Sequence, residues 1–428
     1  MRPPRIGLIS AHTCPLAALG GKETGGMNVY IREVARHLGR LGLEVDVFTR
    51  SQTPGVPEVV PLGPGARVVH IVAGAQQPMP PVEIVAELPE FIDAVEAFRR
   101  RTDGSYALLH GHYWLSGLVA VELARRWDRT PVVQMFHTLG VVKNALADDP
   151  GERVPQARLD AEAKVAALAD RIVAATSLER AELGWYCGAA DDRVRTIPCG
   201  VDVDLFSPGS TGAARALLGL DAEWVLLFVG RPAPVKGLEV LLQALARLKT
   251  DGLARADVRL VIVGGDRDEG RDDERTRLRA LADALGVGGW VDFKGPQLQS
   301  ALPDYYRAAD LCLVPSHHET FGMAALEAMA CGATVIASRV GGLATTIQDG
   351  ITGVLVPPRD DAALAAAIAS LLADVQRRRS LGRQASRWAQ SYAWPSVARA
   401  LIEVYDELVP GLSRTIALPL GADSAIPL

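Results

Sequence analysis

The chain has 428 residues, of which 49% are hydrophobic and 22% are charged, and its formal net charge at pH 7 is -5. This length provides cores for two domains, and the composition is that of a globular protein rather than a disordered or fibrous one. The slightly negative charge gives no general reason to expect a nucleic-acid partner. No run approaches the roughly 18 apolar residues of a membrane span, so stable membrane insertion is not expected.

Short apolar, β-rich runs alternate with longer helical patterns along the chain. The runs of the first half are RIGLIS, EVDVFTR, ARVVHIVAG, LLHGHY, PVVQMFHT, RIVAATS and VRTIPCG. Those of the second half are WVLLFVGR, VRLVIVGG, VDFKG, LCLVPS, ATVIAS and GVLVPP. Helical patterns such as MNVYIREVARHLGRLG and GLEVLLQALARLK lie between them. Such alternation predicts an α/β protein with parallel sheets covered by helices, and two sets predict two doubly wound Rossmann-like domains.

The segment PCGVDVDLFSPGSTG separates the two sets, because glycine, proline and aspartate cluster there. We predict one domain over residues 1–200 and a second over 201–394, with a C-terminal helix at 395–410 returning to the first. A helical pattern precedes it over Asp361 to Ala389, and residues 411–428 are expected to be a loose tail. Ligands of such sheets bind at the carboxyl ends of strands, so domains facing across a cleft would share one site.

Metal binding is not expected. Five scattered cysteines lack C-x-x-C spacing and favour neither a disulfide framework nor a zinc site. His110 and His112 have the spacing of a strand-borne metal pair, but no further ligand lies nearby in sequence. The acidic stretch Asp202 to Asp204 belongs to the linker.

The first apolar run is interrupted by His12 and Pro15. It therefore predicts a strand rather than a signal peptide, and we expect a cytoplasmic protein.

The stretch HHETFGMAALEAMACG carries two carboxylates, Glu319 and Glu327, eight positions apart. Eight helical residues rise about 12 Å, too far for the acid pair of a glycoside hydrolase. Phe321-Gly322 interrupts the pattern, so Glu319 is expected in a loop and Glu327 in the first turns of a helix. Such a helix start attracts phosphate. The stretch alone is equally compatible with two surface glutamates and with an elongated ligand that has an anionic middle.

Three further stretches place polar groups beside glycines or at strand ends. In VGRPAPVKG, Arg231 and Lys236 can neutralise a diphosphate, although they could also be solvated surface cations. Gly26 in TGGMNVY lets a ligand approach the first amides of a helix, or simply makes a tight turn. His137 ends a strand, where it would face the cleft or be a satisfied buried histidine.

Together these stretches resemble the retaining glycosyltransferases of the two-domain GT-B fold, a family that includes sucrose synthases and bacterial mannosyl- and N-acetylglucosaminyltransferases. The most specific element is the E-x7-E pattern ETFGMAALE, supported by GRPAPVKG, PCGVDVDLFSP and GGLATTIQDGITGVLVPP. The resemblance covers about residues 5–408. It implies catalytic roles for His137, Glu319, Arg231 and Lys236. It implies a donor site made of Gly26, Arg231, Lys236, Glu319, Phe321, Gly322, Met323 and Glu327.

Within that family, GGMNVYIREVARHL, HGHYWLSG and FHTLGVVKN are most similar to the inositol-phosphate N-acetylglucosaminyltransferases of the mycothiol pathway. This similarity implies an acceptor site made of Asn28, Tyr113, Thr138 and Arg158. Those enzymes also use a lysine that is expected near PMPPVEIVAELPEF, and this segment contains none. The acceptor therefore stays open between a sugar phosphate, a sugar and another polyol.

The implied reaction moves a hexose or N-acetylhexosamine, with retention, from a nucleoside diphosphate sugar to that acceptor. A UDP-sugar is the favoured donor, and no metal or other cofactor is implied. The partners are these two small molecules, and a homodimer is left open. A sucrose- or sucrose-phosphate-synthase-type transferase and a nucleotide-sugar epimerase are the alternatives. A dinucleotide oxidoreductase is disfavoured because no G-x-G-x-x-G follows a strand.

Overall fold

The structure, a computed structural model, describes residues 3–17, 24–147, 151, 153–250, 257–265 and 273–415. The chain divides into two compact units. Unit 1 holds residues 3–17, 26–199 and 394–415, and unit 2 holds residues 24–25 and 200–393. The cleft expected between two such domains stays a prediction.

Unit 1 is built on an eight-stranded sheet in the order β3-β4-β2-β1-β5-β6-β7-β8. Every neighbouring pair is parallel except β3 with β4. The strands are β1 (Arg5–Ser10), β2 (Glu44–Arg50), β3 (Val59–Gly63), β4 (Ala66–Ile71), β5 (Leu108–His112), β6 (Val132–Met135), β7 (Arg171–Ala174) and β8 (Val194–Thr196). All predicted strands of this half are present. The sequence missed β3, a largely exposed antiparallel edge strand that contains Pro61 and ends at Gly63.

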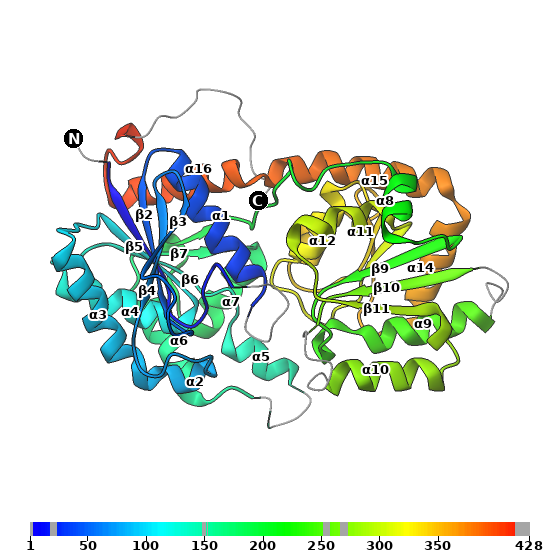
Figure 1. The fold of residues 1–428 in the computed structure, drawn as a ribbon, viewed down its shortest axis with the longest axis horizontal. Helices are drawn as coiled ribbons and strands as arrows, with labels where there is room; N and C mark the ends of the chain where they lie inside the picture. The colour runs from blue at the N-terminus through cyan, green and yellow to red at the C-terminus, as the bar shows by residue number, and fades with distance from the viewer. Residues whose placement is uncertain are drawn as a thin grey trace. The chain divides into compact units, whose positions relative to one another are not determined.

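Helices cover the sheet of unit 1. They are α1 (Gly26–Arg40), α2 (Pro81–Ile84), α3 (Leu88–Arg101), α4 (Tyr113–Arg126), α5 (Gly140–Leu146), α6 (Gln156–Leu168), α7 (Ser177–Cys187) and α16 (Trp394–Leu408). Figure 1 shows α1 and α16 together on one face of the sheet and α3, α4 and α6 on the other. The C-terminal helix α16 packs on α1, where Trp394 meets Tyr30 edge to face at 5.6 Å between ring centroids.

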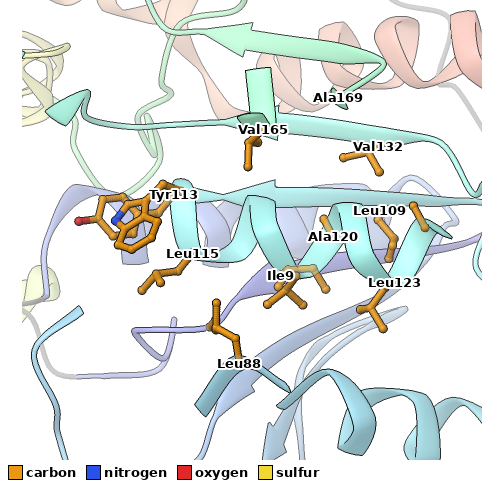
Figure 2. Close-up of a cluster of buried hydrophobic side chains, with 14 of the residues drawn as sticks. Ile9, Leu88, Leu109, Tyr113, Leu115, Ala120, Leu123, Val132, Val165 and Ala169 are labelled. Carbon is orange, nitrogen blue, oxygen red and sulfur yellow. The ribbon is translucent and has the colours of Figure 1, made fainter. Parts of the chain in front are cut away.

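One part of the core of unit 1 lies between its sheet and α4. Figure 2 shows Leu115 and Leu123 of α4 among a buried cluster that includes Ile9 and Leu109 of the central strands. Near-continuous apolar runs suit strands that are buried on both faces, since neither face meets water. The polar side chains within these strands, such as Asp46 of β2 and His110 of β5, are buried and have hydrogen-bond partners in Arg67 and the Tyr405 hydroxyl.

Unit 2 is built on a six-stranded parallel sheet in the order β11-β10-β9-β12-β13-β14. Its strands are β9 (Trp224–Val229), β10 (Val258–Val263), β11 (Val291–Gly295), β12 (Leu311–Val314), β13 (Val335–Ser338) and β14 (Val354–Val356). All predicted strands of the second half are present. Numbered within the unit, this order is 3-2-1-4-5-6, the order of a doubly wound nucleotide-binding sheet.

The helices of unit 2 are α8 (Thr211–Leu218), α9 (Leu238–Thr250), α10 (Asp273–Ala284), α11 (Leu302–Ala308), α12 (Met323–Ala330), α13 (Leu343–Thr346), α14 (Asp361–Ala373) and α15 (Val375–Ala389). The helical pattern predicted over Asp361 to Ala389 is two helices. They separate at Asp374, whose side chain accepts a hydrogen bond from the Arg377 amide and so caps α15.

The acidic stretch at the boundary between the two units forms a turn. Asp202 caps a turn by accepting the amides of Asp204 and Leu205, which agrees with the linker assignment of this acidic stretch. In the predicted loose tail, Leu412 is buried, and residues 416–428 lie outside the described residues. Among the helices that the structure describes, none is both long and apolar enough to cross a bilayer.

Helix α1 approaches the β3–β4 hairpin at a glycine. A Cβ placed on Gly39 would lie 2.2 Å from the Pro64 carbonyl oxygen, so Gly39→Ala should destabilise unit 1 by about 1–3 kcal/mol through overpacking. Gly184 in α7 is the matched control, because its added Cβ would make one ordinary contact with the Ala189 carbonyl at 3.7 Å. Gly184→Ala should stabilise by about 0.5–1 kcal/mol. Free energies of unfolding from urea titrations test this, and equal shifts in both variants would contradict it.

Candidate functional site

The carboxyl ends of β9 and β12 mark the point in unit 2 where the strand order reverses. The chain runs outward from β9 through β10 to β11 and then returns to β12, which pairs with β9 on its other side. Helices leave two such strands toward opposite faces, which opens a crevice at their carboxyl ends. Arg231 follows β9 closely and Glu319 follows β12, so both predicted donor residues lie at this edge.

Lys236 and Glu319 form an ion pair at this edge. The Lys236 ammonium donates to Glu319 Oε1 at 2.5 Å, and the Ser316 hydroxyl donates to the same oxygen at 3.2 Å. The two side chains are 28% and 17% exposed, so both remain accessible. An ammonium has three donor hydrogens, and this bond uses one of them. Lys236 and Glu319, predicted as separate donor-site residues, are therefore in direct contact, a pairing that the sequence did not predict.

Glycines hold the Lys236 turn against the loop after β12. Lys236 ends a 3-10 turn that is followed by Gly237 at φ 66°, a conformation that favours glycine. A Cβ on Gly237 would lie 2.1 Å from the Pro315 carbonyl oxygen, and the His317 amide donates to the Val235 carbonyl at 2.7 Å. The lysine turn and the glutamate loop thus dock through backbone contacts that only glycine permits.

A second glycine turn supports the same loop from the other side. A Cβ on Gly341 would lie 2.0 Å from the Glu319 carbonyl oxygen, and the Gly342 amide donates to that oxygen at 2.8 Å. Gly322, at φ 92°, then caps α12. The first amides of α12 therefore have no partner within their own helix, the arrangement that binds phosphate groups. The sequence signal for this support was the Gly-Gly pair of GGLATT, which the pattern reasoning did not use.

The side chains of the E-x7-E stretch point to different surroundings. Phe321 is buried and lies 6.0 Å from the Tyr392 ring, so only its backbone can meet a ligand. Glu327 lies in α12 as predicted and accepts a hydrogen bond from the Tyr306 hydroxyl at 2.9 Å. Burial, and next the Glu327 charge, hold the pKa of Tyr306 well above its usual value. Sequence reasoning missed Tyr306, because nothing distinguishes it from other buried helix aromatics.

In unit 1 the strand order reverses between β1 and β5, and aromatic residues meet there. His12 follows β1 and Tyr113 follows β5, and their ring centroids are 4.4 Å apart. Tyr113 has φ 75° and His137, after β6, has φ 62°. Such backbone costs about 1–3 kcal/mol for a residue with a Cβ and is concentrated at functional sites. Two of the predicted site residues therefore carry stored backbone strain.

Three of the four predicted acceptor residues form one cluster. Arg158 donates to the Tyr113 hydroxyl at 2.9 Å and to Thr138 Oγ1 at 3.1 Å, and its guanidinium lies 4.9 Å from the Tyr113 ring centroid. Arg158 comes from α6, far from the other two in sequence. The fourth residue, Asn28, is buried at the start of α1, and its amide nitrogen donates to Thr13 Oγ1 and the Cys14 carbonyl at 2.7 and 2.8 Å. Its structure-supporting bonds were not predicted, and its acceptor contact stays a prediction.

A buried carboxylate balances the Arg158 charge. Arg158 Nε donates to Glu162 Oε1 at 2.7 Å, and the Gly140 amide donates to Glu162 Oε2 at 2.8 Å. Burial raises the pKa of Glu162, while Arg158 opposes the rise. The four-residue spacing on α6 was a sequence signal for this pair that was not used.

His137 is held by a second histidine. Its Nε2 lies 3.1 Å from Nδ1 of His112, the last residue of β5. Burial, and next the nearby His110, lower the pKa of His137 to about 3, so the ring is neutral at pH 7. His110 contacts the Tyr405 hydroxyl through Nδ1 at 2.7 Å. The described residues contain no group of three or more side chains suited to a metal ion, and His110 and His112 serve in this network.

Arg158→Met should destabilise unit 1 by about 3–5 kcal/mol, because it leaves the buried Glu162 charge without its partner. The double variant Arg158→Met/Glu162→Leu should recover most of that loss, since neither charge then remains buried. Free energies of unfolding at pH 7, measured for the wild type, both single variants and the double variant, give the coupling. Additive losses would show that the pair is not the main source of the effect.

The sequence also matches known families over both halves. A model described as glycosyl transferases group 1 matches residues 214–388, and one described as glycosyltransferase family 4 matches residues 24–205. The chain is 43% identical over 418 residues to D-inositol 3-phosphate glycosyltransferase 2 of Catenulispora acidiphila, with 96% of each chain covered. It is 42% identical over 406 residues to the D-inositol 3-phosphate glycosyltransferase of Acidothermus cellulolyticus, covering 94% of this chain and 90% of that one.

A solved structure has the same fold over nearly the whole chain. The sucrose-phosphate synthase of Thermosynechococcus elongatus superposes with a TM-score of 0.86 at 37% identity, and the match covers 95% of this chain and 99% of that one. The predicted fold class and enzyme class are thereby confirmed. This chain belongs to the glycosyltransferase family of these relatives and is a glycosyltransferase with two Rossmann-like domains of the GT-B type.

Proposed function

We propose that this enzyme transfers a sugar from a nucleoside diphosphate sugar, with a UDP-sugar as the favoured donor, to a phosphorylated polyol or sugar. Unit 2 binds the donor, and the observation that carries this proposal is the Lys236–Glu319 contact at the ends of β9 and β12. Unit 1 binds the acceptor. The relatives' name, D-inositol 3-phosphate glycosyltransferase, supports a phosphorylated acceptor.

The donor site neutralises the charge that develops on the leaving diphosphate. Lys236 and Arg231 supply two cations, and the first amides of α12 supply oriented dipoles. These groups are fixed before the reaction, so they stabilise the transition state without rearrangement. We propose that they act without a metal or other cofactor.

Glu319 and Glu327 hold opposite ends of the donor. Both described bonds to Glu319 reach Oε1, so its Oε2 can accept a hydrogen bond from a hydroxyl of the sugar. Glu327, one helical stretch farther on and anchored by Tyr306, accepts from the ribose hydroxyls. A charged hydrogen bond of this kind contributes about 1.5–3 kcal/mol, which is enough to discriminate among hexoses.

The sugar is transferred with retention. The bond between the anomeric carbon and the phosphate oxygen breaks, and the acceptor oxygen bonds to the same face of that carbon. The acceptor proton passes to the leaving phosphate, so neither glutamate is the general base. His137, neutral at pH 7, contributes a hydrogen bond to the donor sugar rather than a proton.

The acceptor phosphate lies against the cluster of Tyr113, Thr138 and Arg158 in unit 1. Thr138 is exposed, and its Oγ1 accepts from Arg158, which leaves its own hydrogen to be donated to a phosphate oxygen. We propose that this cluster holds the phosphate without the lysine that other enzymes of this type use.

The free cysteines indicate the cellular compartment of the enzyme. All five are unpaired thiols, and four of them are buried. Thiols are maintained in a reducing compartment, so we propose a cytoplasmic enzyme. The homodimer that the sequence left open stays open.

A thermal-shift panel of UDP-, GDP- and ADP-sugars tests the donor site. A donor present at 100 times its Kd should stabilise the protein by roughly 2.7 kcal/mol. Glu327→Ala should weaken the binding of bare nucleoside diphosphate more than Glu319→Ala, which should mainly reduce turnover and discrimination between sugars. Glu223→Ala, at an exposed position of unit 2, is the control. No shift with any donor, or equal loss of nucleotide binding in both variants, would refute the assignment.

Thr138→Val tests the acceptor site. The variant should lower the ratio of kcat/KM for a phosphorylated polyol to that for the same polyol without phosphate by about tenfold or more, because a hydrogen bond to a charged group is lost. Thr102→Val, whose hydroxyl bonds the Phe98 carbonyl in its own helix, is the matched control. An unchanged ratio would place the acceptor phosphate elsewhere. Incubation with donor alone is a further arm, and an epimerised donor would contradict the transferase assignment of the site.

A further inference from the structure

A buried chain of aromatic and imidazole side chains runs through unit 1 to His137. The Tyr405 hydroxyl of α16 contacts His110 Nδ1 at 2.7 Å, and the His110 ring lies over the His112 ring with centroids 4.3 Å apart. His112 Nδ1 then contacts His137 Nε2 at 3.1 Å. His110 and His112 are fully buried, whereas His137 is half-buried. The chain therefore links the C-terminal helix to the residue proposed to meet the donor sugar.

All three imidazoles are neutral at pH 7. Burial lowers the pKa of His110 to about 3 and the pKa of His112 well below its usual value, as it does for His137. A neutral imidazole carries one proton, so one nitrogen donates and the other accepts. The short contact between His112 and His137 must contain one proton. Whichever of the two rings carries this proton determines the tautomer of both rings.

The burial of His112 decides between the two arrangements. Its Nε2 is buried and has no hydrogen-bond partner among the residues that the structure describes. If His137 donated to His112 Nδ1, the proton of His112 would lie on this Nε2 as a buried, unsatisfied N–H. If His112 donates instead, Nε2 carries only a lone pair. Unsatisfied buried donors are the rarer and costlier case, so the second arrangement is favoured.

We propose that His112 is a positioning residue that donates its Nδ1 hydrogen to His137 Nε2 and so keeps the proton of His137 on Nδ1. His137 then presents an N–H donor, rather than a lone pair, to an oxygen of the donor sugar. This last consequence rests on the proposed function, whereas the tautomer itself is a property of the protein alone.

Packing around His137 leaves its ring little freedom to escape this arrangement. Tyr30 meets the His137 ring edge to face at 5.3 Å between centroids and the His112 ring at 5.7 Å, and Trp394 of α16 supports Tyr30. The backbone of His137 is held at φ 62°. A ring flipped about its Cβ–Cγ bond would lose the His112 bond.

Nitrogen-15 NMR of histidine-labelled protein without substrates tests the tautomer directly. In the wild type, the spectrum should show His137 protonated at Nδ1. His112→Leu removes the donor and should shift His137 toward the Nε2–H form. His112→Asn places an amide donor near the position of Nδ1 and should restore the Nδ1–H form. A wild-type signal from the Nε2–H form, or the same tautomer in His112→Leu, would overturn the proposal.

Kinetics separate the proposal from the function on which it rests. His112→Leu should lower kcat by about three- to tenfold, the value of one lost hydrogen bond, with His112→Asn closer to wild type and nucleoside diphosphate affinity unchanged in both. Wild-type turnover in His137→Ala would refute the catalytic role of His137 and leave the tautomer result standing. If His112→Leu fails to fold, the wild-type and His112→Asn spectra still decide the matter.

Discussion

The burial of parallel strands on both faces is the constraint on which the rest of this structure depends. The central strands of both units pair on both sides and lie under helices, so their backbone polar groups are satisfied within the sheets and their side chains are mostly apolar. Most of the polar groups of the candidate sites therefore follow the carboxyl ends of the strands. At the points where the strand order reverses, the loops diverge and their polar side chains can meet a ligand.

The two units use these ends in different ways. In unit 2, glycine turns allow two loops to pack closely, and the Lys236 and Glu319 side chains remain accessible. In unit 1, most of the polar groups are buried and bonded to one another, as in the Arg158–Glu162 pair and the histidine chain from Tyr405 to His137. Removing one partner of a buried polar pair leaves the other unsatisfied, which is costly, so single substitutions at this end of unit 1 should be destabilising. Accessible cations suit a charged leaving group, and a cluster of polar groups bonded to one another suits the orientation of an acceptor.

Much of this arrangement was predictable from local sequence. Apolar runs of five to nine residues predicted all strands but one, because strands buried on both faces need no alternation. The exposed edge strand β3 was missed because its short apolar run is broken by a proline. The E-x7-E stretch and the two cations were predictable because they stand beside glycines at strand ends. Most partners of the site residues were not, since Tyr306 and Tyr405 belong to other elements and resemble ordinary helix residues, whereas Glu162 had a signal in its four-residue spacing from Arg158. His112 was predictable only as half of an unsupported metal pair, because its bond to His137 depends on the pairing of β5 with β6.

The central claim is that the reversal point of the unit 2 sheet binds the diphosphate of a nucleotide sugar. A crystal structure of the protein with bound UDP-N-acetylglucosamine tests it most directly. The account predicts diphosphate oxygens within hydrogen-bond distance of Lys236 Nζ and the first amides of α12, with the ribose at Glu327. A nucleotide bound instead at the ends of β1 and β5 in unit 1 would contradict it.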